Sequence, residues 1–335
     1  MNFKSVYIKL SVVAAFAGAM VACNTDVENL EIQKPNTYSE LYYKNLRDFK
    51  ATDHQISFMW FADYTSPHTL GHRFLGLPDS LDICSLWGGI PSDVEGKPNT
   101  FYAPKTYEEM RFIQKVKGVK LVRPLFPSIG SNKWLEKYLP AETKEDSLTL
   151  IKAFGDSLLR TVYDNDLDGL DLDHEIHGDW MYGENFSNLV KYLGEHIGPK
   201  GKDPEKILIV DGWPFDDGYE YITYFVSQAY QSWGAGDLQN RYDEIAEKIG
   251  PERFIVTENI GDYYATGGVD FTEADGNQYT ETGERLTSLE GMARWNPTQG
   301  KKGGFGAFYS QRDYNSNPPY KYFRKGIQIQ NPAIR

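Results

Sequence analysis

The segment DNDLDGLDLDHE, residues 164–175, decides how the middle of the chain folds, because it fits two incompatible structures. As a calcium-binding loop, it matches the pattern D-x-D/N-x-D/N-G-x5-E at every specified position. As a β-strand, it places Asp171, Asp173 and Glu175 at every second position, and therefore on one face. The first structure would hold a metal ion, whereas the second would align three carboxylates for chemistry.

Three features of the sequence argue against the calcium loop. The eighth loop position, where paired calcium loops need an apolar residue, is Asp171. The residues that follow, IHGDWMYGENF, contain glycines at 178 and 183 and do not predict a helix. The sequence has no second loop of this kind. We therefore expect a strand and no metal site, and burial of its carboxylates would push a proton onto one of them.

A rhythm of short apolar strands and helical stretches begins near residue 50. Most of the strands are apolar on both faces, as buried parallel strands are. Helices are predicted between several of them, one with a capping box of Thr106 and Glu109 and others over residues 144–165 and 237–250. The expected strands are residues 55–61, 80–88, 120–128, 169–175, 206–213, 224–231, 253–260 and 304–310.

Strand–helix alternation repeated eight times is typical of a (β/α)8 TIM barrel. The sequence therefore predicts an α/β fold with one barrel domain over residues 50–335. An open doubly wound sheet is the alternative, but no G-x-G-x-x-G follows the first strand. In a barrel the inward face of residues 169–175 would open into the active site at the carboxyl end of the strand.

The stretch DGLDLDHE, residues 168–175, matches the D-G-x-D-x-D-x-E motif of glycoside hydrolase family 18 at every fixed position. The chain resembles this family, which contains chitinases and endo-β-N-acetylglucosaminidases, and the family's S-x-G-G motif is present in weakened form as SIGS, from Ser128. The resemblance implies a (β/α)8 barrel in which Glu175 protonates the glycosidic oxygen. Asp173 would orient the 2-acetamido group of the substrate, which itself attacks the anomeric carbon. Asp171 would lie behind Asp173 and share a proton with it, and Asp168 and Ser128 would be structural.

The sixth predicted strand ends in QAYQ, residues 228–231, where chitinases of the family carry Met-x-Tyr-Asp. The resemblance implies that Tyr230 hydrogen-bonds the acetamide carbonyl, and Gln228 in the methionine place favours the endo-β-N-acetylglucosaminidase branch. Tyr309 stands where chitinases place a tryptophan floor. Weaker candidates for lining the cleft lie at other strand ends: Trp213, Asp211, Asn259, Glu258, Trp60 and Trp87.

These residues predict an endo-acting glycosidase that cleaves the GlcNAc-β-1,4-GlcNAc core of N-glycans with retention, through an oxazolinium and without a cofactor. A chitinase or chitooligosaccharidase is one alternative. A surface glycan-binding protein without catalysis is the other. Glu175 and Asp173 are both present, which favours an enzyme, and a chain with seven tryptophans, none on the eighth strand, is a poorer match to chitin.

The first 23 residues predict export. Lys4 and Lys9 precede an apolar run from residue 10 to residue 22, which is typical of a signal peptide. The run ends at Cys23, as in a bacterial lipobox, so we expect a lipid on Cys23, a signal peptide over residues 1–22 and a polar tether over residues 23–49. The protein would then be anchored in the bacterial cell envelope, on the outer-membrane surface.

Charge and cysteine content narrow the partners further. Without residues 1–22 the chain carries 33 basic and 47 acidic residues, a net charge of −14, which disfavours nucleic acid and anionic lipid and permits a neutral carbohydrate. The second of the two cysteines, Cys84, lies in an apolar run, and we expect a buried thiol without a disulfide. The expected partners are GlcNAc-containing glycans and, through the lipid alone, a membrane. We expect a monomer.

Overall fold

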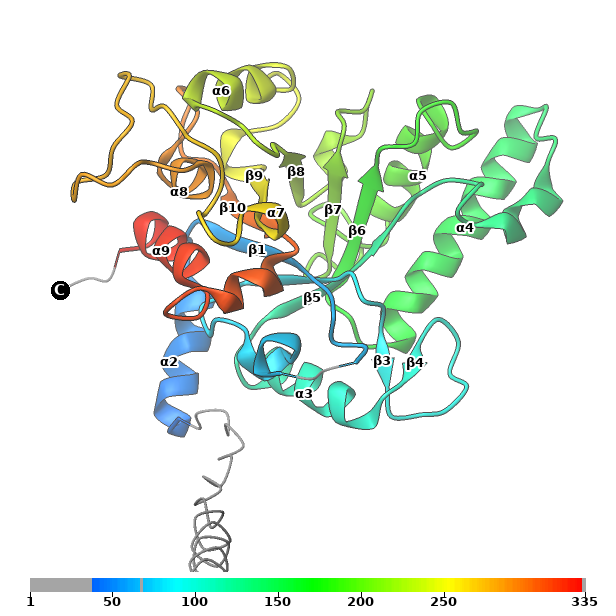
Figure 1. The fold of residues 1–335 in the computed structure, drawn as a ribbon. Helices are drawn as coiled ribbons and strands as arrows, with labels where there is room; N and C mark the ends of the chain where they lie inside the picture. Colours follow the sequence, from blue (N-terminus) through cyan, green and yellow to red (C-terminus); the bar gives the residue numbers. More distant parts are fainter. Residues whose placement is uncertain (1–37, 67–68, 333–335) are drawn as a thin grey trace, which may run out of the picture. The chain divides into compact units, whose positions relative to one another are not determined.

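The computed structural model describes residues 38–66 and 69–332. Eight parallel strands form a closed barrel in the order β1-β10-β9-β8-β7-β6-β5-β2 (Figure 1). This confirms the predicted TIM barrel, and each barrel strand lies within one of the eight expected ranges. The strands are β1 (Ile56–Phe61), β2 (Ile83–Leu86), β5 (Lys120–Leu125), β6 (Gly169–His174), β7 (Ile207–Gly212), β8 (Tyr224–Gln228), β9 (Phe254–Asn259) and β10 (Gly304–Phe308).

Helices and a two-stranded sheet surround the barrel. The helices are α2 (Glu40–Lys50), α3 (Pro104–Lys115), α4 (Lys144–Asp164), α5 (Glu184–Gly194), α6 (Ala235–Asp243), α7 (Ile260–Tyr263), α8 (Ser288–Arg294) and α9 (Lys321–Gln330). Short 3-10 turns occupy Leu70–His72, Phe74–Gly76, Lys133–Tyr138, Tyr219–Tyr221, Pro251–Arg253 and Ser310–Asn315. Strands β3 (Pro91–Ser92) and β4 (Phe101–Tyr102) pair beside the barrel.

Strand alternation separates two apolar cores. Residues that point into the barrel, such as Phe58, Ile209 and Val226, pack together in its interior. Their sequence neighbours on the same strands, such as Leu208 and Phe225, pack outward against the helices. Both faces are buried, which explains why the strands read as nearly continuous apolar runs.

Two local predictions about helices and the N-terminal segment were wrong. Helix α3 begins at Pro104, and Thr106 does not cap it, because proline with its fixed φ already starts the helix. The predicted tether is too long, because residues 40–50 form α2, in which Tyr43 is buried. The side chain of Arg47 donates to the carbonyl of Val116 at 2.6 Å, which fixes α2 to the segment between α3 and β5.

Helix α4 shows where a cap does form. Thr143 accepts a hydrogen bond from the amide of Asp146, and the Asp146 side chain accepts one from the amide of Thr143, so both halves of a capping box are present. The helix runs to Asp164, and β6 begins at Gly169. The segment 164–175 is therefore the end of a helix, a turn and a strand, as the strand interpretation predicts.

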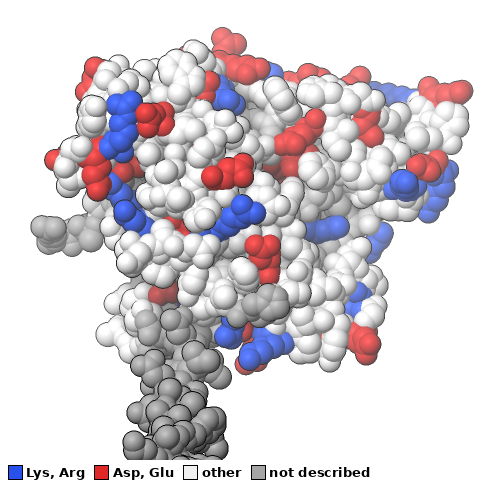
Figure 2. Space-filling model, in the orientation of Figure 1, with Lys and Arg blue, Asp and Glu red and all other residues white. Residues whose placement is uncertain are grey.

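The outside of the described chain carries mixed charge. Acidic and basic side chains are interspersed over the face shown in Figure 2. In residues 38–66 and 69–332, no helix combines the length and the apolar character needed to cross a bilayer. Cys84 lies on β2 with its side chain buried in the outer core, and burial raises the pKa of its thiol.

Candidate active site

Two of the three predicted carboxylates, Asp171 and Asp173, lie on the inward face of β6, and Glu175 directly follows its carboxyl end. The strand begins at Gly169, where a Cβ atom would lie 1.9 Å from the carbonyl oxygen of Ile207 on the neighbouring strand. Glycine therefore permits the close approach of β6 to β7 that closes the barrel at this point. From Gly169, residues at every second position face inward, which brings Asp171, Asp173 and Glu175 into one column.

Asp171 is the deepest of the three and is fully buried. Its Oδ2 accepts hydrogen bonds from the indole nitrogen of Trp60, at 2.9 Å, and from the hydroxyl of Ser85, at 2.6 Å. Burial raises the pKa of Asp171, and these donors oppose the rise. Trp60 is only 2% exposed. The prediction that it lines the open cleft is therefore wrong, since it lies beside Asp171 as a donor.

Asp173 is also buried, and its carboxyl group shares a hydrogen bond with Glu175. Burial, followed by the charges of Glu175 and Asp171, raises the pKa of Asp173 to about 8. The Nε2 atom of Gln228 lies 3.3 Å from Asp173 Oδ1. Asp173 therefore keeps a proton at neutral pH, and it lies next to Glu175.

Glu175 lies at the mouth of the barrel, where it is partly exposed. It lines a cavity of about 400 Å³ together with Trp213 and Gln228, and Arg241 of α6 forms part of the opposite wall. Trp213 is 55% exposed and stands at the end of β7, with its ring 5.4 Å from that of His177. This cavity brings together the predicted acid and two of the predicted substrate-binding residues.

Asp211 on β7 adds a fourth acid, which the sequence indicated only as a weak candidate at a strand end. It is fully buried, and its Oδ2 accepts a hydrogen bond from Gln228 Nε2 at 2.8 Å. Asp211 and Asp171 face each other in hydrogen-bond contact. Asp171 is therefore in contact with Asp211, whereas the sequence predicted Asp173 as its partner. The alternation of residues along the two strands could have indicated this, because Asp211 pairs in register with Asp173 on the adjacent strand and so faces the same side.

Aromatic rings form the other side of the site. Tyr230 follows β8, and its ring stacks with that of Phe308 at 6.0 Å and 20°. Burial and the neighbouring acids raise the pKa of Tyr230 well above its usual value, so its hydroxyl remains a hydrogen-bond donor. Phe308 also meets Trp87 edge-on at 5.4 Å.

The predicted floor residue is displaced by one position. Phe308 is the last inward residue of β10, whereas Tyr309 leaves the strand with a φ of 49°. Tyr309 packs beside Gly261 and under the guanidinium of Arg312, 5.4 Å away. The inward-facing aromatic residue at this position is therefore Phe308, because the chain turns out of the barrel before Tyr309.

The remaining predicted residues lie at the edges of the site or below it. Asn259 ends β9, where its Nδ2 donates to Asp262 at 3.0 Å. Asp168 lies at the opposite end of β6 and accepts the amide of Leu121 at 2.8 Å. Ser128 is buried in the turn after β5 and bonds the hydroxyl of Ser131 at 2.9 Å. The contacts of Asp168 and Ser128 are those of structural residues. In the described part of the chain, no group of three or more acidic, histidine or cysteine side chains is arranged to hold a metal.

The family model for glycoside hydrolase family 18, BT1044-like, matches residues 24–329. The chain belongs to glycoside hydrolase family 18. Among curated relatives, endo-β-N-acetylglucosaminidase EndoS of Streptococcus pyogenes serotype M1 is 28% identical in a match of 293 aligned positions that covers 74% of this chain. The match spans 28% of the streptococcal protein, and the chain spans less than half the length of the curated relatives it matches.

Solved structures of family 18 share the fold. A structure of a BT1044 variant superposes with a TM-score of 0.74 at 19% identity, covering 90% of this chain and 97% of that one. An endo-β-N-acetylglucosaminidase variant from Cordyceps militaris, in complex with fucosyl-N-acetylglucosamine-Asn, gives a TM-score of 0.60 at 22% identity, covering 89% and 98%. Chitinases share the barrel at lower TM-scores, such as 0.51 for a family 18 chitinase from Pseudoalteromonas aurantia. At these identities the superpositions show a common fold.

Proposed function

We propose that this family 18 member is an endo-β-N-acetylglucosaminidase that cleaves the GlcNAc-β-1,4-GlcNAc core of N-glycans. The observation that carries the proposal is the hydrogen-bonded pair of Asp173 and Glu175 at the mouth of the barrel, beside a cavity of about 400 Å³. Glu175 donates the proton to the glycosidic oxygen, and the substrate's own acetamide oxygen attacks the anomeric carbon. No protein nucleophile is needed.

The surroundings of the pair support this chemistry. When Glu175 gives up the shared proton, Asp173 is left as an anion beside the acetamide, where it holds the N–H group and balances the positive oxazolinium. Tyr230, whose hydroxyl stays protonated, donates to the acetamide carbonyl and orients it for attack. Phe308 supplies an apolar floor under the ring of Tyr230.

Two further observations favour an endo-β-N-acetylglucosaminidase over a chitinase. Gln228 occupies the place where the resemblance puts methionine in chitinases, and Phe308 forms the floor in place of tryptophan. The Cordyceps militaris protein bound to fucosyl-N-acetylglucosamine-Asn carries amide replacements of an aspartate and a glutamate two residues apart. Asp173 and Glu175 have the same spacing in this chain, which supports their assignment as the reacting pair, although chitinases of the family share the motif and the spacing does not separate the two activities.

The test is the mass of the product released from defined substrates. We expect the wild-type protein to release glycans from high-mannose or complex glycoproteins and to leave a single GlcNAc on asparagine. Glu175→Gln is the matched control, because it keeps the shape of the side chain and removes the proton donor. Cleavage of chitooligosaccharides alone would indicate a chitinase, and glycan binding without cleavage of either substrate would indicate a binding protein.

The proposal includes a location. The lipobox-like pattern that ends at Cys23 supports a lipid anchor on the outer surface of the bacterial envelope, although Cys23 lies outside the described residues. Cys23→Ala should move the protein from the membrane fraction to the soluble fraction without loss of specific activity. A protein that stays in the membrane fraction after this change would contradict lipid anchoring at Cys23.

A further inference from the structure

Gln228 makes two contacts that fix the orientation of its amide. Its Nε2 lies 2.8 Å from Asp211 Oδ2 and 3.3 Å from Asp173 Oδ1. An amide nitrogen carries two donor hydrogens, whereas the amide oxygen can only accept. If the amide were flipped, its oxygen would face two carboxyl oxygens. The side-chain carbonyl of Gln228 therefore points away from Asp211 and Asp173, and Gln228 is one of the residues that line the cavity beside Glu175.

Asp211 and Asp171 together require a proton. Each has an Oδ1 atom that is buried and has no other hydrogen-bond partner among the described residues, and these two carboxyl groups face each other. Two buried carboxylates in contact would repel each other strongly, whereas a carboxylic acid and a carboxylate form a short, charge-assisted hydrogen bond. The titratable groups facing Asp211 are Asp171 and Asp173 on β6 and Tyr230 after β8.

The donors around the pair decide which residue holds the proton. Asp171 already accepts from Trp60 and Ser85, and both donors stabilise its anionic form. Asp211 accepts one hydrogen bond, from an uncharged amide. Asp211 is therefore the better site for the proton, and its O–H group donates to Asp171. Burial raises the pKa of Asp211 in the same direction.

We propose that Asp211 is a positioning residue, a protonated carboxylic acid that clamps the amide of Gln228 so that the Gln228 carbonyl faces the bound sugar. The acid donates to Asp171 through one oxygen and accepts from Gln228 through the other. The exposed carbonyl then accepts a hydrogen bond from an N–H or O–H group of the GlcNAc unit in the cavity. This inference rests on the proposed function, because it names an acceptor for that substrate.

The sharpest test exploits the shape of asparagine. Asp211→Asn reproduces a protonated aspartate, since its nitrogen can donate to Asp171 and its oxygen can accept from Gln228. We expect this variant to keep kcat/KM within about fivefold of the wild type. Asp211→Leu has the same branching as aspartate but no polar atoms, and releases Gln228, so kcat/KM should fall roughly 10- to 100-fold, the effect of losing one hydrogen bond to a substrate.

A double-mutant cycle identifies Gln228 as the residue through which Asp211 acts. Gln228→Leu alone should match the loss in Asp211→Leu, and the double variant should be no worse than either single variant, because the two changes remove the same contact. Multiplied losses in the double variant would overturn the proposal. So would an Asp211→Asn variant as impaired as Asp211→Leu, because a charged carboxylate would then be required. Melting temperatures measured alongside show whether each variant is folded.

A measurement without turnover keeps this inference separate from the proposed function. With isotopically labelled aspartate, the infrared spectrum of the wild type at neutral pH should contain a protonated-carboxyl band that Asp211→Asn removes. An unchanged spectrum would overturn the protonated state. If the wild type cleaves neither glycoproteins nor chitooligosaccharides, the proposed function fails, and the spectrum still tests the proton on Asp211.

Discussion

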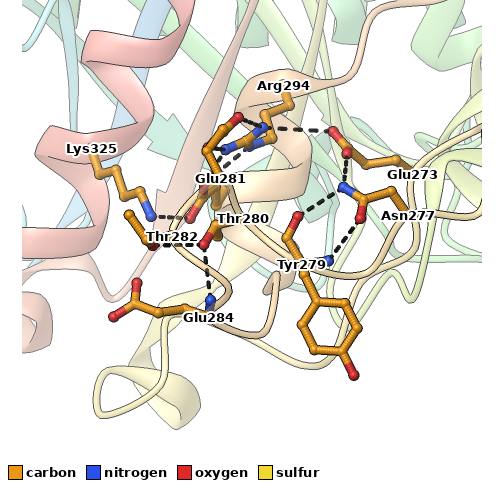
Figure 3. Close-up of polar contacts among 10 residues, drawn as sticks. Glu273, Asn277, Tyr279, Thr280, Glu281, Thr282, Glu284, Arg294 and Lys325 are labelled. Carbon is orange, nitrogen blue, oxygen red and sulfur yellow. Dashed lines mark hydrogen bonds and ion pairs between the residues drawn. The ribbon is translucent and has the colours of Figure 1, made fainter.

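Acidic side chains gather in two regions of the described chain, with opposite surroundings. Inside the barrel, Asp171, Asp173, Asp211 and Glu175 lie together, and the charges of neighbouring acids help to raise the pKa of Asp173 and Asp211. On the outside, three glutamates surround Arg294 at the end of α8 (Figure 3). Figure 3 also shows a nearby turn, in which the side-chain amide of Asn277 donates to the carbonyl of Tyr279 and accepts from the Tyr279 amide.

The outer cluster pairs each acid with a cation. Arg294 contacts Glu281 and Glu290, each at 2.7 Å, and Glu290 also contacts Lys325 at 2.6 Å. The hydrogen bond with Arg294 lowers the pKa of Glu281 to about 2. The contacts of Glu273 and Glu281 with Arg294 attach the long segment between α7 and α8 to α8, and the Glu290–Lys325 pair joins α8 to α9. The cluster therefore stabilises the position of the segment between α7 and α8.

Among the described residues, the acids of the inner cluster have no cation paired with them. The pKa values of three of these acids are raised and not lowered. Burial raises the pKa of Asp171, Asp173 and Asp211. Keeping such acids together costs stability, and a fold retains groups of this kind where chemistry needs protons near neutral pH. The direction of the pKa shift therefore separates a site of reaction from a structural brace, although both are acid-rich in sequence.

The largest expected effect is at Glu175. Glu175→Gln should lower turnover by roughly 10²–10⁴, the usual contribution of a general acid, while glycan binding survives. Hydrolysis followed by mass spectrometry, and binding followed by calorimetry, measure the two quantities separately. Wild-type turnover in this variant would show that the inner cluster is not the reacting site.

Asp173→Asn should separate two halves of the reaction. Formation of the oxazolinium needs the Asp173 anion, so hydrolysis should fall by about 10²-fold or more. A supplied glycan oxazoline has already passed that step and should still be joined to a GlcNAc acceptor. A thiazoline analogue should inhibit the wild type. A covalent sugar ester trapped on Asp173 or Asp171 with a fluorosugar would contradict the substrate-assisted route.

The raised pKa of Asp173 predicts two pH effects. The proton shared with Glu175 is lost as pH rises through about 8, so kcat/KM should decline there. For stability, the folded state keeps a proton that the unfolded state releases above its ordinary aspartate pKa. The free energy of unfolding should therefore fall as pH rises from about 4 to about 8, and the melting temperature of Asp173→Asn should gain on the wild type across that window. A constant difference between the two would argue against a buried proton on Asp173.

The smallest expected effects are in the outer cluster. Arg294→Met should lower the free energy of unfolding by about 1–2 kcal/mol, because it leaves the largely buried Glu290 with one cation fewer. Turnover should stay near the wild-type value. Arg285→Met is the matched control, since the Arg285–Asp270 pair is solvent-exposed and should contribute little to the free energy of unfolding. Denaturant unfolding measures both, and equal losses would remove the distinction between them.

The sequence predicted the strands and the column of carboxylates because both follow from alternation within one segment. Periodicity could not show that Asp211 faces Asp171, since that contact depends on two strands that are paired in space. It also could not locate the point at which β10 ends, so the floor was predicted at Tyr309 rather than Phe308. The proposed cap of α3 failed for a similar reason, because Glu109 is buried against Arg73, a residue distant in sequence.

The buried thiol of Cys84 can report local opening of the barrel. The sequence has two cysteines, so once Cys23 carries the proposed lipid, Cys84 is the one thiol left to react. It is fully buried with a raised pKa, and a thiol reagent can modify it only when β2 and its outer layer separate. The rate of modification in native buffer therefore reports how often this side of the barrel opens, and it can be read in a mass spectrometer for each variant without heat or denaturant.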